Sequence, residues 1–409
     1  MNVTRESEIR SRATGERMLI AAFAAILMVC LCSAAAFGQC TLTGTLSTWN
    51  VAGNSDWNTG ANWSPVGVPN SNPDSVCITY GTSTVTLEAN ASIASLQLAK
   101  GNTLGFNGNT QLSVFGTQMI NAGQILINGG GGTNTYMFID NSMTLSGAGT
   151  LTLSNTVSGG GATDLYANNG AATLTNQSTI QGEGSIGASG SALTLVNSSG
   201  GIIDANSTAG PLSLAPYIPA AGGITNAGLM EATNSGLLQL QNTTVNNAGG
   251  NITATGSAAQ VQLYSGTDIQ GGTLNTTSGG TLGSFQSGVT LDGSTAAGAV
   301  TVSAGSTYTG EGNSQTTVLG TINNKGSILL NGGGTNLYAT AASTLTNQST
   351  VQGEGTFGNN GSTFNERLRL LWQAAGLRRS GARLDAGLLH SQPDKSGHQA
   401  GEQCSGKAR

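Results

Sequence analysis

The chain has 409 residues, of which 63 are glycine and only 8% are charged, and its formal net charge is −5. Residues 39–364 hold twelve carboxylates, two lysines and no histidine, so this part carries a net charge of −10. Proteins bind nucleic acids and anionic surfaces through lysine and arginine, so this composition argues against both as partners. The lack of histidine also excludes a Ser–His catalytic pair within this region.

Residues 1–38 have the pattern of an export signal. Four arginines, the last being Arg17, precede an apolar run from Met18 to Phe37, and the small residue Gly38 follows. We expect cleavage before Gln39 and export across the inner membrane, to the cell surface or beyond it. The alternative is an uncleaved membrane anchor, because about 20 apolar residues can span a bilayer. The membrane is then a partner only through this segment.

Two cysteines, Cys40 and Cys77, follow this segment. Exported proteins reach oxidising compartments, so we expect these two to form a disulfide, with two free thiols as the alternative. On the loop-entropy model the bridge would stabilise the fold by about 3 to 4 kcal/mol.

Residues 39–80 carry three tryptophans and are expected to form an N-terminal cap module. The motifs are Trp49-Asn-Val-Ala-Gly-Asn-Ser-Asp-Trp57, Asn62-Trp63-Ser64, Val68-Pro69 and Asp74-Ser-Val-Cys-Ile78. They resemble the opening module of bacterial exported β-helix proteins, which include autotransporter passenger-like and autotransporter-associated β-strand repeat proteins. The resemblance implies secretion or surface display, commonly as adhesin-like or matrix proteins, and transfers no catalytic position. The chain departs from a full autotransporter in showing no C-terminal translocating barrel.

Two roles are open for Trp49, Trp57 and Trp63. The end of a solenoid exposes apolar core and unpaired strand groups, so we expect these large side chains to cap it. Alternatively, exposed indole rings would form a platform on which sugar rings stack.

Repeats dominate residues 81–364. A fifteen-residue stretch at 173–187 returns at 344–358 with twelve identical positions. A shorter unit, in which an Asn-x-Gly turn precedes an apolar or alternating run, begins at Asn121, Asn226, Asn247 and Asn324. Asparagine and glycine tolerate the positive φ of tight turns, so each unit predicts a turn followed by a strand. The recurrence of these motifs along the chain indicates one structural unit stacked many times.

The runs between turns alternate apolar and polar residues, as in Thr150-Leu-Thr-Leu-Ser154. Alternation with period two indicates strands with one buried face. We therefore predict an all-β chain in which residues 81–364 form a right-handed parallel β-solenoid of about thirteen coils, with Ile125 and Ile328 in its core. A β-sandwich is set aside, because a sandwich has no reason to repeat its sequence.

The acidic residues of the solenoid region are spread thinly. Gly-Glu-Gly recurs around Glu183, Glu311 and Glu354, and carboxylates roughly 5 to 10 Å apart can hydrolyse a glycosidic bond. Glu183 and Glu354, however, are copies of one repeat position about seven coils apart, so we interpret them as turn residues. The calcium nonapeptide and phosphate-loop motifs do not occur. We predict no catalytic residue, no cofactor and no metal site.

Residues 365–409 differ from the preceding repeats in composition and pattern. They hold eight of the fourteen lysines and arginines, both histidines and Trp372, and they begin in the middle of a repeat, after Phe364. We interpret this as a truncated or frameshifted end, with a functional basic tail as the alternative. We expect a short helix over 366–375 and a disordered, unattached segment over 376–409, whose deletion leaves the melting temperature unchanged.

The sequence therefore predicts an exported or surface-displayed, structural or adhesin-like β-solenoid without catalytic activity. Its expected partners are extracellular glycans or host and matrix surfaces. The alternative is a polysaccharide-binding or polysaccharide-degrading β-helix.

Overall fold

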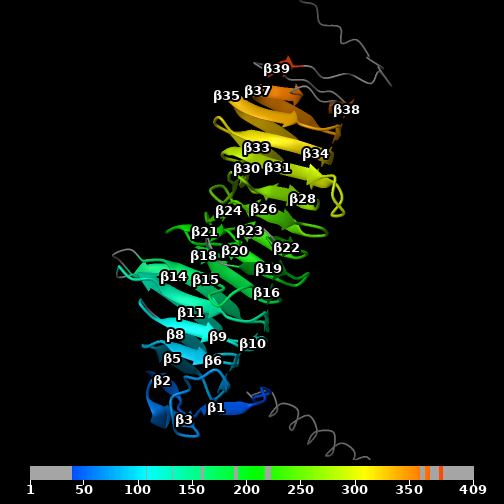
Figure 1. Ribbon diagram of the computed structural model, residues 1–409. Coiled ribbons are helices and arrows are strands. Elements are labelled where there is room, and N and C mark those ends of the chain that lie inside the picture. The colour runs from blue at the N-terminus through cyan, green and yellow to red at the C-terminus, as the bar shows by residue number, and fades with distance from the viewer. Residues whose placement is uncertain are drawn as a thin grey trace, which may run out of the picture.

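The chain forms a rod of stacked coils, with the N-terminal strands at one end and the C-terminal strands at the other (Figure 1). The computed structural model describes residues 39–106, 108–130, 132–157, 161–187, 192–216, 223–359, 364–368 and 377–380. Within these ranges the fold is a parallel β-solenoid of about 12 turns, which confirms the predicted class. The export signal predicted at 1–38 lies outside the described residues.

Three columns of stacked strands form three faces of the rod. Face A contains β1 (Thr45–Trp49), β4 (Asp74–Ile78), β7 (Ser95–Leu98), β10 (Gln118–Asn121), β13 (Met143–Ser146), β16 (Ala172–Asn176), β19 (Leu193–Asn197), β22 (Ile224–Asn226), β25 (Thr244–Asn246), β28 (Asp268–Gln270), β31 (Ser287–Gly293) and β39 (Leu377–Ser380). Face B contains β2 (Gly53–Asp56), β5 (Ser83–Leu87), β8 (Thr103–Phe106), β11 (Gln124–Gly130), β14 (Thr150–Val157), β17 (Thr179–Gly182), β20 (Ile202–Ala205), β23 (Leu229–Ala232), β26 (Asn251–Thr255), β29 (Thr273–Thr277), β32 (Val300–Val302), β36 (Ser343–Asn347) and β38 (Phe364–Leu368). Face C contains β6 (Ala91–Ile93), β9 (Gln111–Val114), β12 (Thr135–Ile139), β15 (Thr163–Tyr166), β18 (Gly184–Ile186), β21 (Pro211–Leu214), β24 (Leu237–Leu240), β27 (Gln260–Leu263), β30 (Thr281–Ser284) and β33 (Thr307–Glu311).

Three longer strands turn a corner between two faces. They are β34 (Gln315–Asn324), from face A to face B, and β35 (Ser327–Ala339) and β37 (Thr350–Asn359), both from face C to face A. Pairing between successive turns is parallel, while the short strand β3 (Trp63–Ser64), which follows the 3-10 turn Gly60–Asn62, pairs antiparallel with β1.

The core follows directly from the alternating sequence. On face B, Leu151 of β14 lies between Ile125 one turn before it and Ile180 one turn after it, and all three are buried. Threonines such as Thr150 and Thr152 alternate with them and point outward. Each large apolar side chain removed from water contributes about 1.5 to 3 kcal/mol. Ile125 and Ile328 are 0% and 1% exposed, as predicted.

Asparagines at the corner between faces A and B form a hydrogen-bonded ladder, here called the Asn ladder. Its members are Asn176, Asn197, Asn226 and Asn247, all fully buried. The amide Nδ2 of each of the first three donates to Oδ1 of the next, at 2.7 to 2.8 Å. Because a buried amide without partners is costly, the ladder requires asparagine at every one of these turns. The Asn-x-Gly pattern is therefore a corner motif.

Replacing Asn226 by alanine is expected to lower the free energy of unfolding by about 2 to 4 kcal/mol. The change leaves Oδ1 of Asn247 without its 2.7 Å donor and removes bonds to Asn197 and to the Asn251 carbonyl. Urea unfolding followed by circular dichroism measures the loss. Asn246→Ala is the matched control, because Asn246 is exposed and its replacement should cost less than about 0.5 kcal/mol. Equal losses would refute a special role for the ladder.

The two copies of the fifteen-residue repeat lie on different faces. Thr173–Asn176 belongs to β16 on face A, whereas Thr344–Asn347 belongs to β36 on face B. The asparagine that ends each copy therefore lies at the corner after face A in the first copy and at the corner after face B in the second. The Asn ladder accordingly stops at Asn247, whose Nδ2 donates to the Gly271 carbonyl, and a new pair starts at Asn324, whose Nδ2 donates to Asn347.

The start of the tail continues the solenoid. Residues 364–368 form β38 on β36, so the helix expected over 366–375 is wrong for its first three residues. Residues 377–380 form β39 on β37, so this part of the segment expected to be unattached is attached. An open strand edge pairs with any extended segment that reaches it, which explains both strands. Residues 369–376 and 381–409 lie outside the described residues.

Candidate functional site

The three tryptophans of the cap are buried, and an exposed sugar-stacking platform is therefore ruled out for them. Trp49, Trp57 and Trp63 are 0%, 0% and 1% exposed. The ring of Trp63 makes edge contacts with Trp49 at 4.9 Å and Trp57 at 4.8 Å between centroids. Its indole N–H donates to the Trp57 carbonyl, and that of Trp57 donates to the Pro69 carbonyl. Their burial leaves capping as the role that stays predicted for them.

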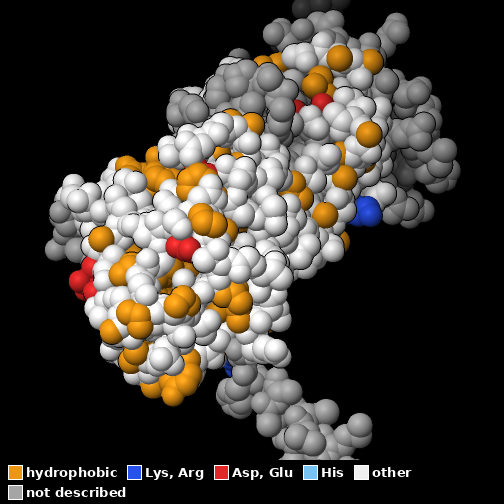
Figure 2. Space-filling model, turned by 60° about the horizontal axis from the view of Figure 1, so that its bottom comes forward, with side chains coloured by type: hydrophobic (Ala, Val, Ile, Leu, Met, Phe, Trp, Pro, Cys, Tyr) orange, Lys and Arg blue, Asp and Glu red, His pale blue; other side chains and the backbone are white. Residues whose placement is uncertain are grey.

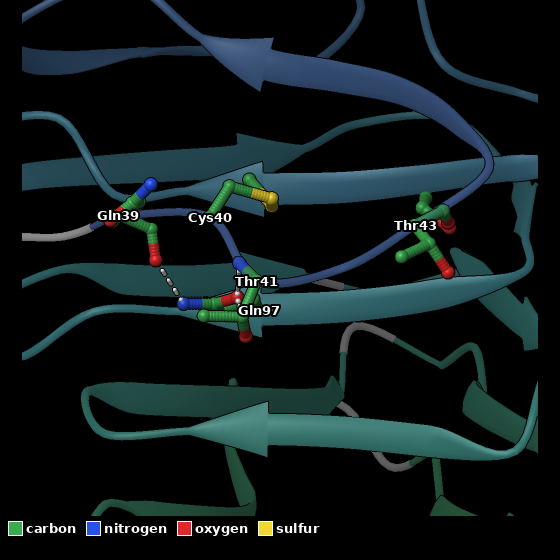
Figure 3. Close-up of a disulfide and its surroundings, with 7 residues drawn as sticks. Gln39, Cys40, Thr41, Thr43 and Gln97 are labelled. Carbon is green, nitrogen blue, oxygen red and sulfur yellow. Dashed lines mark hydrogen bonds between the residues drawn. A yellow bond between two sulfur atoms is a disulfide. The ribbon is translucent and has the colours of Figure 1, made fainter.

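Cys40 and Cys77 form the predicted disulfide, with their Cα atoms 5.9 Å apart. Cys77 lies in β4, where four successive residues are buried instead of alternate ones. The reason is that the segment 39–43 crosses the outside of face A. Gln97 of β7 holds it there, accepting from the Thr41 N–H at 2.8 Å and donating to the Gln39 carbonyl at 2.9 Å (Figure 3).

The Gly-Glu-Gly motifs lie at corners, as expected for turn residues. Glu183 is 2% exposed, and its carboxylate accepts from the Asn155 N–H and the Ser207 hydroxyl, both at 2.9 Å. Glu311 and Glu354 lie at the later corner between faces C and A, in one row with Asn331 between them. They are therefore two turns, or about 10 Å, apart along the rod. The fold thus brings together two acids that the sequence had separated.

Face C carries a cluster of outward-pointing aromatic side chains, here called the aromatic patch: Tyr136, Phe138 and Tyr166. Tyr136 and Phe138 alternate with buried residues on β12, and Tyr166 lies beside Phe138 in the next turn. The Phe138 ring stacks on Tyr136 at 5.3 Å and meets the edge of Tyr166 at 5.0 Å. Phe138 is 6% exposed, whereas both tyrosines are partly exposed. Phe138 is therefore the floor of the patch, and the tyrosines are its accessible rings.

Two carboxylates flank the aromatic patch. Asp164 is the neighbour of Tyr136 across the strand pair, and Asp140 follows β12 two residues after Phe138. Asp140 is 8% exposed, and neither carboxylate oxygen accepts a hydrogen bond of normal geometry. Burial raises the pKa of both groups, and the nearby Ser113 side chain and Asn169 backbone offset this only in part for Asp140. The patch thus combines aromatic rings with poorly solvated acceptors.

A second group lies further along face C. Tyr264 and Phe285 follow β27 and β30 and occupy successive turns of the outward row that also contains Tyr166. Glutamines line the neighbouring row, where the Gln239 amide donates to Gln262 at 3.3 Å and to the Tyr264 hydroxyl at 3.1 Å. Four turns, or about 19 Å, separate Tyr166 from Tyr264.

These residues were not predicted from the sequence, although a signal for them was present. Tyr136-Met-Phe138 is an aromatic pair at alternate positions of a strand, and such residues share one side of the sheet. The local pattern could not show that Tyr166 lies beside Tyr136 and Phe138. Tyr166 follows them by about 30 residues, and the number of residues in one coil was not known in advance.

Buried and half-buried acids are expected to make the stability of the rod depend on pH. Desolvation is the largest cause of a raised pKa for Asp140, Asp164, Asp204, Glu231 and Asp268. Each group thus binds its proton more tightly in the folded chain than in the unfolded chain. The free energy of unfolding therefore rises as the pH falls from 7 through the folded pKa values and levels off near the unfolded value of about 4.

We expect a higher urea midpoint at pH 4 than at pH 7, measured at low protein concentration. Asp204→Asn should reduce this difference, because it removes one of the desolvated groups. A midpoint that decreases steadily from pH 7 to pH 4 would contradict the assignment.

Within the described ranges, no three histidine, cysteine, aspartate or glutamate side chains gather closely enough to hold a metal ion. No helix in this part of the chain is long and apolar enough to cross a membrane. The chain matches no protein-family model, no curated protein and no solved structure.

Proposed function

We propose that the chain is an exported or surface-displayed structural solenoid of the adhesin-like kind, which acts by presenting its outer faces and not by catalysis. One observation supports this most directly. Along the described strands many outward positions hold threonine, serine, asparagine or glutamine, with single apolar or aromatic residues such as Ile202, Leu229 and Tyr136 among them. Figure 2 accordingly shows a surface with few charged side chains. Such a surface offers hydrogen-bonding groups over a long distance, which suits binding to extended partners.

Export has separate support. Disulfides typically form and persist in oxidising compartments, so the Cys40–Cys77 bridge supports export, and the charged and apolar segments at 1–38 have the order of a signal peptide. The resemblance of the tryptophan module to exported β-helix proteins agrees with both.

Expression of the full chain in a bacterial host, followed by fractionation, tests the location. We expect the protein in the envelope or the medium, shortened at its N-terminus, with Cys40 and Cys77 oxidised. Full-length protein that stays in the cytoplasm with free thiols would refute export.

Polysaccharide cleavage is the second candidate, because Glu311 and Glu354 lie in one row about 10 Å apart. This is close to the separation of the two carboxyl groups in inverting glycosidases, about 6.5 to 9.5 Å. The Glu311 carboxylate, however, accepts from the Asn331 amide that lies between the two acids, at 2.7 Å. A structural row of side chains accounts for this contact without a substrate.

Incubation with a panel of polysaccharides, scored for both retention and new reducing ends, separates the two candidates. Under the display proposal no new reducing ends form. Cleavage that disappears in Glu311→Gln and in Glu354→Gln would instead establish a hydrolase.

A further inference from the structure

We propose that face C binds a linear, uncharged polysaccharide, which lies along the rod from the aromatic patch toward Tyr264. The inference rests on the proposed display function and names the ligand class and the site that such display would use. Three features of face C support it: the accessible tyrosine rings, a buried acceptor that lacks a hydrogen bond of normal geometry, and the arrangement of small and amide side chains between the two aromatic groups.

The tyrosines of the aromatic patch have the geometry of a stacking surface. Tyr136 is fixed from one side by Phe138 and at its hydroxyl by the Asn134 amide, which donates at 2.6 Å. Tyr166 is fixed edge-on by both neighbours, at 5.7 Å from Tyr136 and 5.0 Å from Phe138. Rings held in this way lose little conformational entropy when a ligand stacks on them. The apolar C–H face of a pyranose is such a ligand.

Asp140 supplies a hydrogen-bond acceptor at the same place. Its carboxylate is more than nine-tenths buried beside the floor of the patch, and neither the nearby Ser113 side chain nor the Asn169 backbone makes a hydrogen bond of normal geometry to it. A buried acceptor without a partner is unfavourable by about 1 to 3 kcal/mol, or more when charged. A sugar hydroxyl that donates to it would recover this free energy, and Asp164 beside Tyr136 offers a second acceptor.

Between the two aromatic groups the outward side chains of face C are small. Gly187 and Ala215 follow Tyr166 in successive turns of one row, and Ser185 and Ser213 occupy the neighbouring row. Large side chains return at Gln241 and Tyr264. Within the described residues of these two rows, a chain that leaves the tyrosines of the patch therefore meets only small side chains until it reaches the glutamines. The repeat of about 4.8 Å per turn is close to the length of one sugar residue, so successive sugars meet successive turns.

Charge selects the class of polysaccharide. Residues 39–364 carry a net charge of −10 with only Lys100 and Lys325 as cations, and both lysines lie at corners outside the face C strands. Uronate or sulfate groups on a ligand would face Asp140 and Asp164 without a countercharge. Electrostatic complementarity therefore excludes acidic polysaccharides and favours neutral ones, whose hydroxyls bind to carboxylates and amides.

The test is a calorimetric binding titration of the purified exported chain with each of three ligands: cellohexaose, chitosan hexamer and hexauronate from pectin. We expect cellohexaose to bind and the uronate not to bind. Tyr136→Ala and Tyr166→Ala should each weaken binding about tenfold or more. The matched control is Tyr338→Ala, which removes an outward, partly exposed tyrosine from face A and should leave binding unchanged.

Asp140→Asn separates binding from folding. Because it removes an unpartnered buried charge, it should leave the melting temperature unchanged or raise it while weakening binding. The inference is wrong if no neutral hexamer binds, if the uronate or the chitosan binds best, or if Tyr136→Ala and Tyr338→Ala bind equally. None of these outcomes bears on export, which fractionation decides, so failure of the site and failure of the display proposal remain distinguishable.

Discussion

Replacement of Trp63 by alanine is expected to lower the free energy of unfolding by about 3 to 5 kcal/mol, the usual cost of removing a buried tryptophan. The side chain is 1% exposed and lies between Trp49 and Trp57, so its loss leaves two large rings facing a cavity. The 2.7 Å hydrogen bond to the Trp57 carbonyl is lost as well. Trp63 therefore joins the chain segments of the cap into one unit.

Urea unfolding and amide hydrogen exchange together measure this effect. In a solenoid each turn contacts mainly its neighbours, so we expect the exchange protection of β1 and β4 to fall more than that of β23. Tyr80→Ala is the control, because Tyr80 lies in the same region but is 52% exposed, and it should cost less than about 0.5 kcal/mol. If the two variants unfold alike, the three tryptophans do not stabilise the cap.

The solenoid class could be predicted because each coil obeys a local rule. Alternation in Thr150-Leu-Thr-Leu-Ser154 places Leu151 and Leu153 in the core without knowledge of any other turn. The turn motif at Asn226 is equally local, because the amide of its side chain needs only the next corner. Such rules fix which residues point inward and where the chain turns.

The face on which a given segment lies could not be predicted, because it depends on the lengths of all the coils that precede the segment. The copies beginning at Thr173 and Thr344 have nearly identical sequences, yet they lie on faces A and B. The position that continues the Asn ladder after Asn247 is Gly271, and the position before Asn324 is Val302. As the three faces are built alike, nothing local prevents the corner motif from moving to the next corner. A consequence is that Oδ1 of Asn324, the first member of its pair, is buried without a partner.

The candidate site also depends on which strands come to lie in adjacent coils of one face. Tyr136 and Tyr166 meet because β12 and β15 are adjacent turns of face C, and Glu311 and Glu354 share a row because β35 lies between their strands. Glu183 and Glu354, by contrast, are related by repetition and lie at different corners. Repetition identifies equivalent positions, whereas a binding site requires neighbouring ones.

Removal of the disulfide by the double change Cys40→Ser and Cys77→Ser is expected to lower the free energy of unfolding by about 3 to 4 kcal/mol. The bridge closes a loop with a sequence separation of 37, and the loss of this constraint favours the unfolded chain. In the folded chain the segment 39–43 would remain attached only by hydrogen bonds, those of Gln97 with Gln39 and Thr41 and that of the Ser75 hydroxyl with the Thr43 carbonyl. Urea unfolding under non-reducing conditions measures the loss.

Gln97→Ala provides the comparison, because it removes the bonds to Gln39 and Thr41 while the disulfide stays intact. We expect it to cost about 1 to 3 kcal/mol. Combination of the cysteine changes with Trp63→Ala should cost less than the sum of the two, because both act on the same cap and either one releases it. Strict additivity would show that the bridge and the tryptophans stabilise separate units, and that residues 39–80 do not act as one cap.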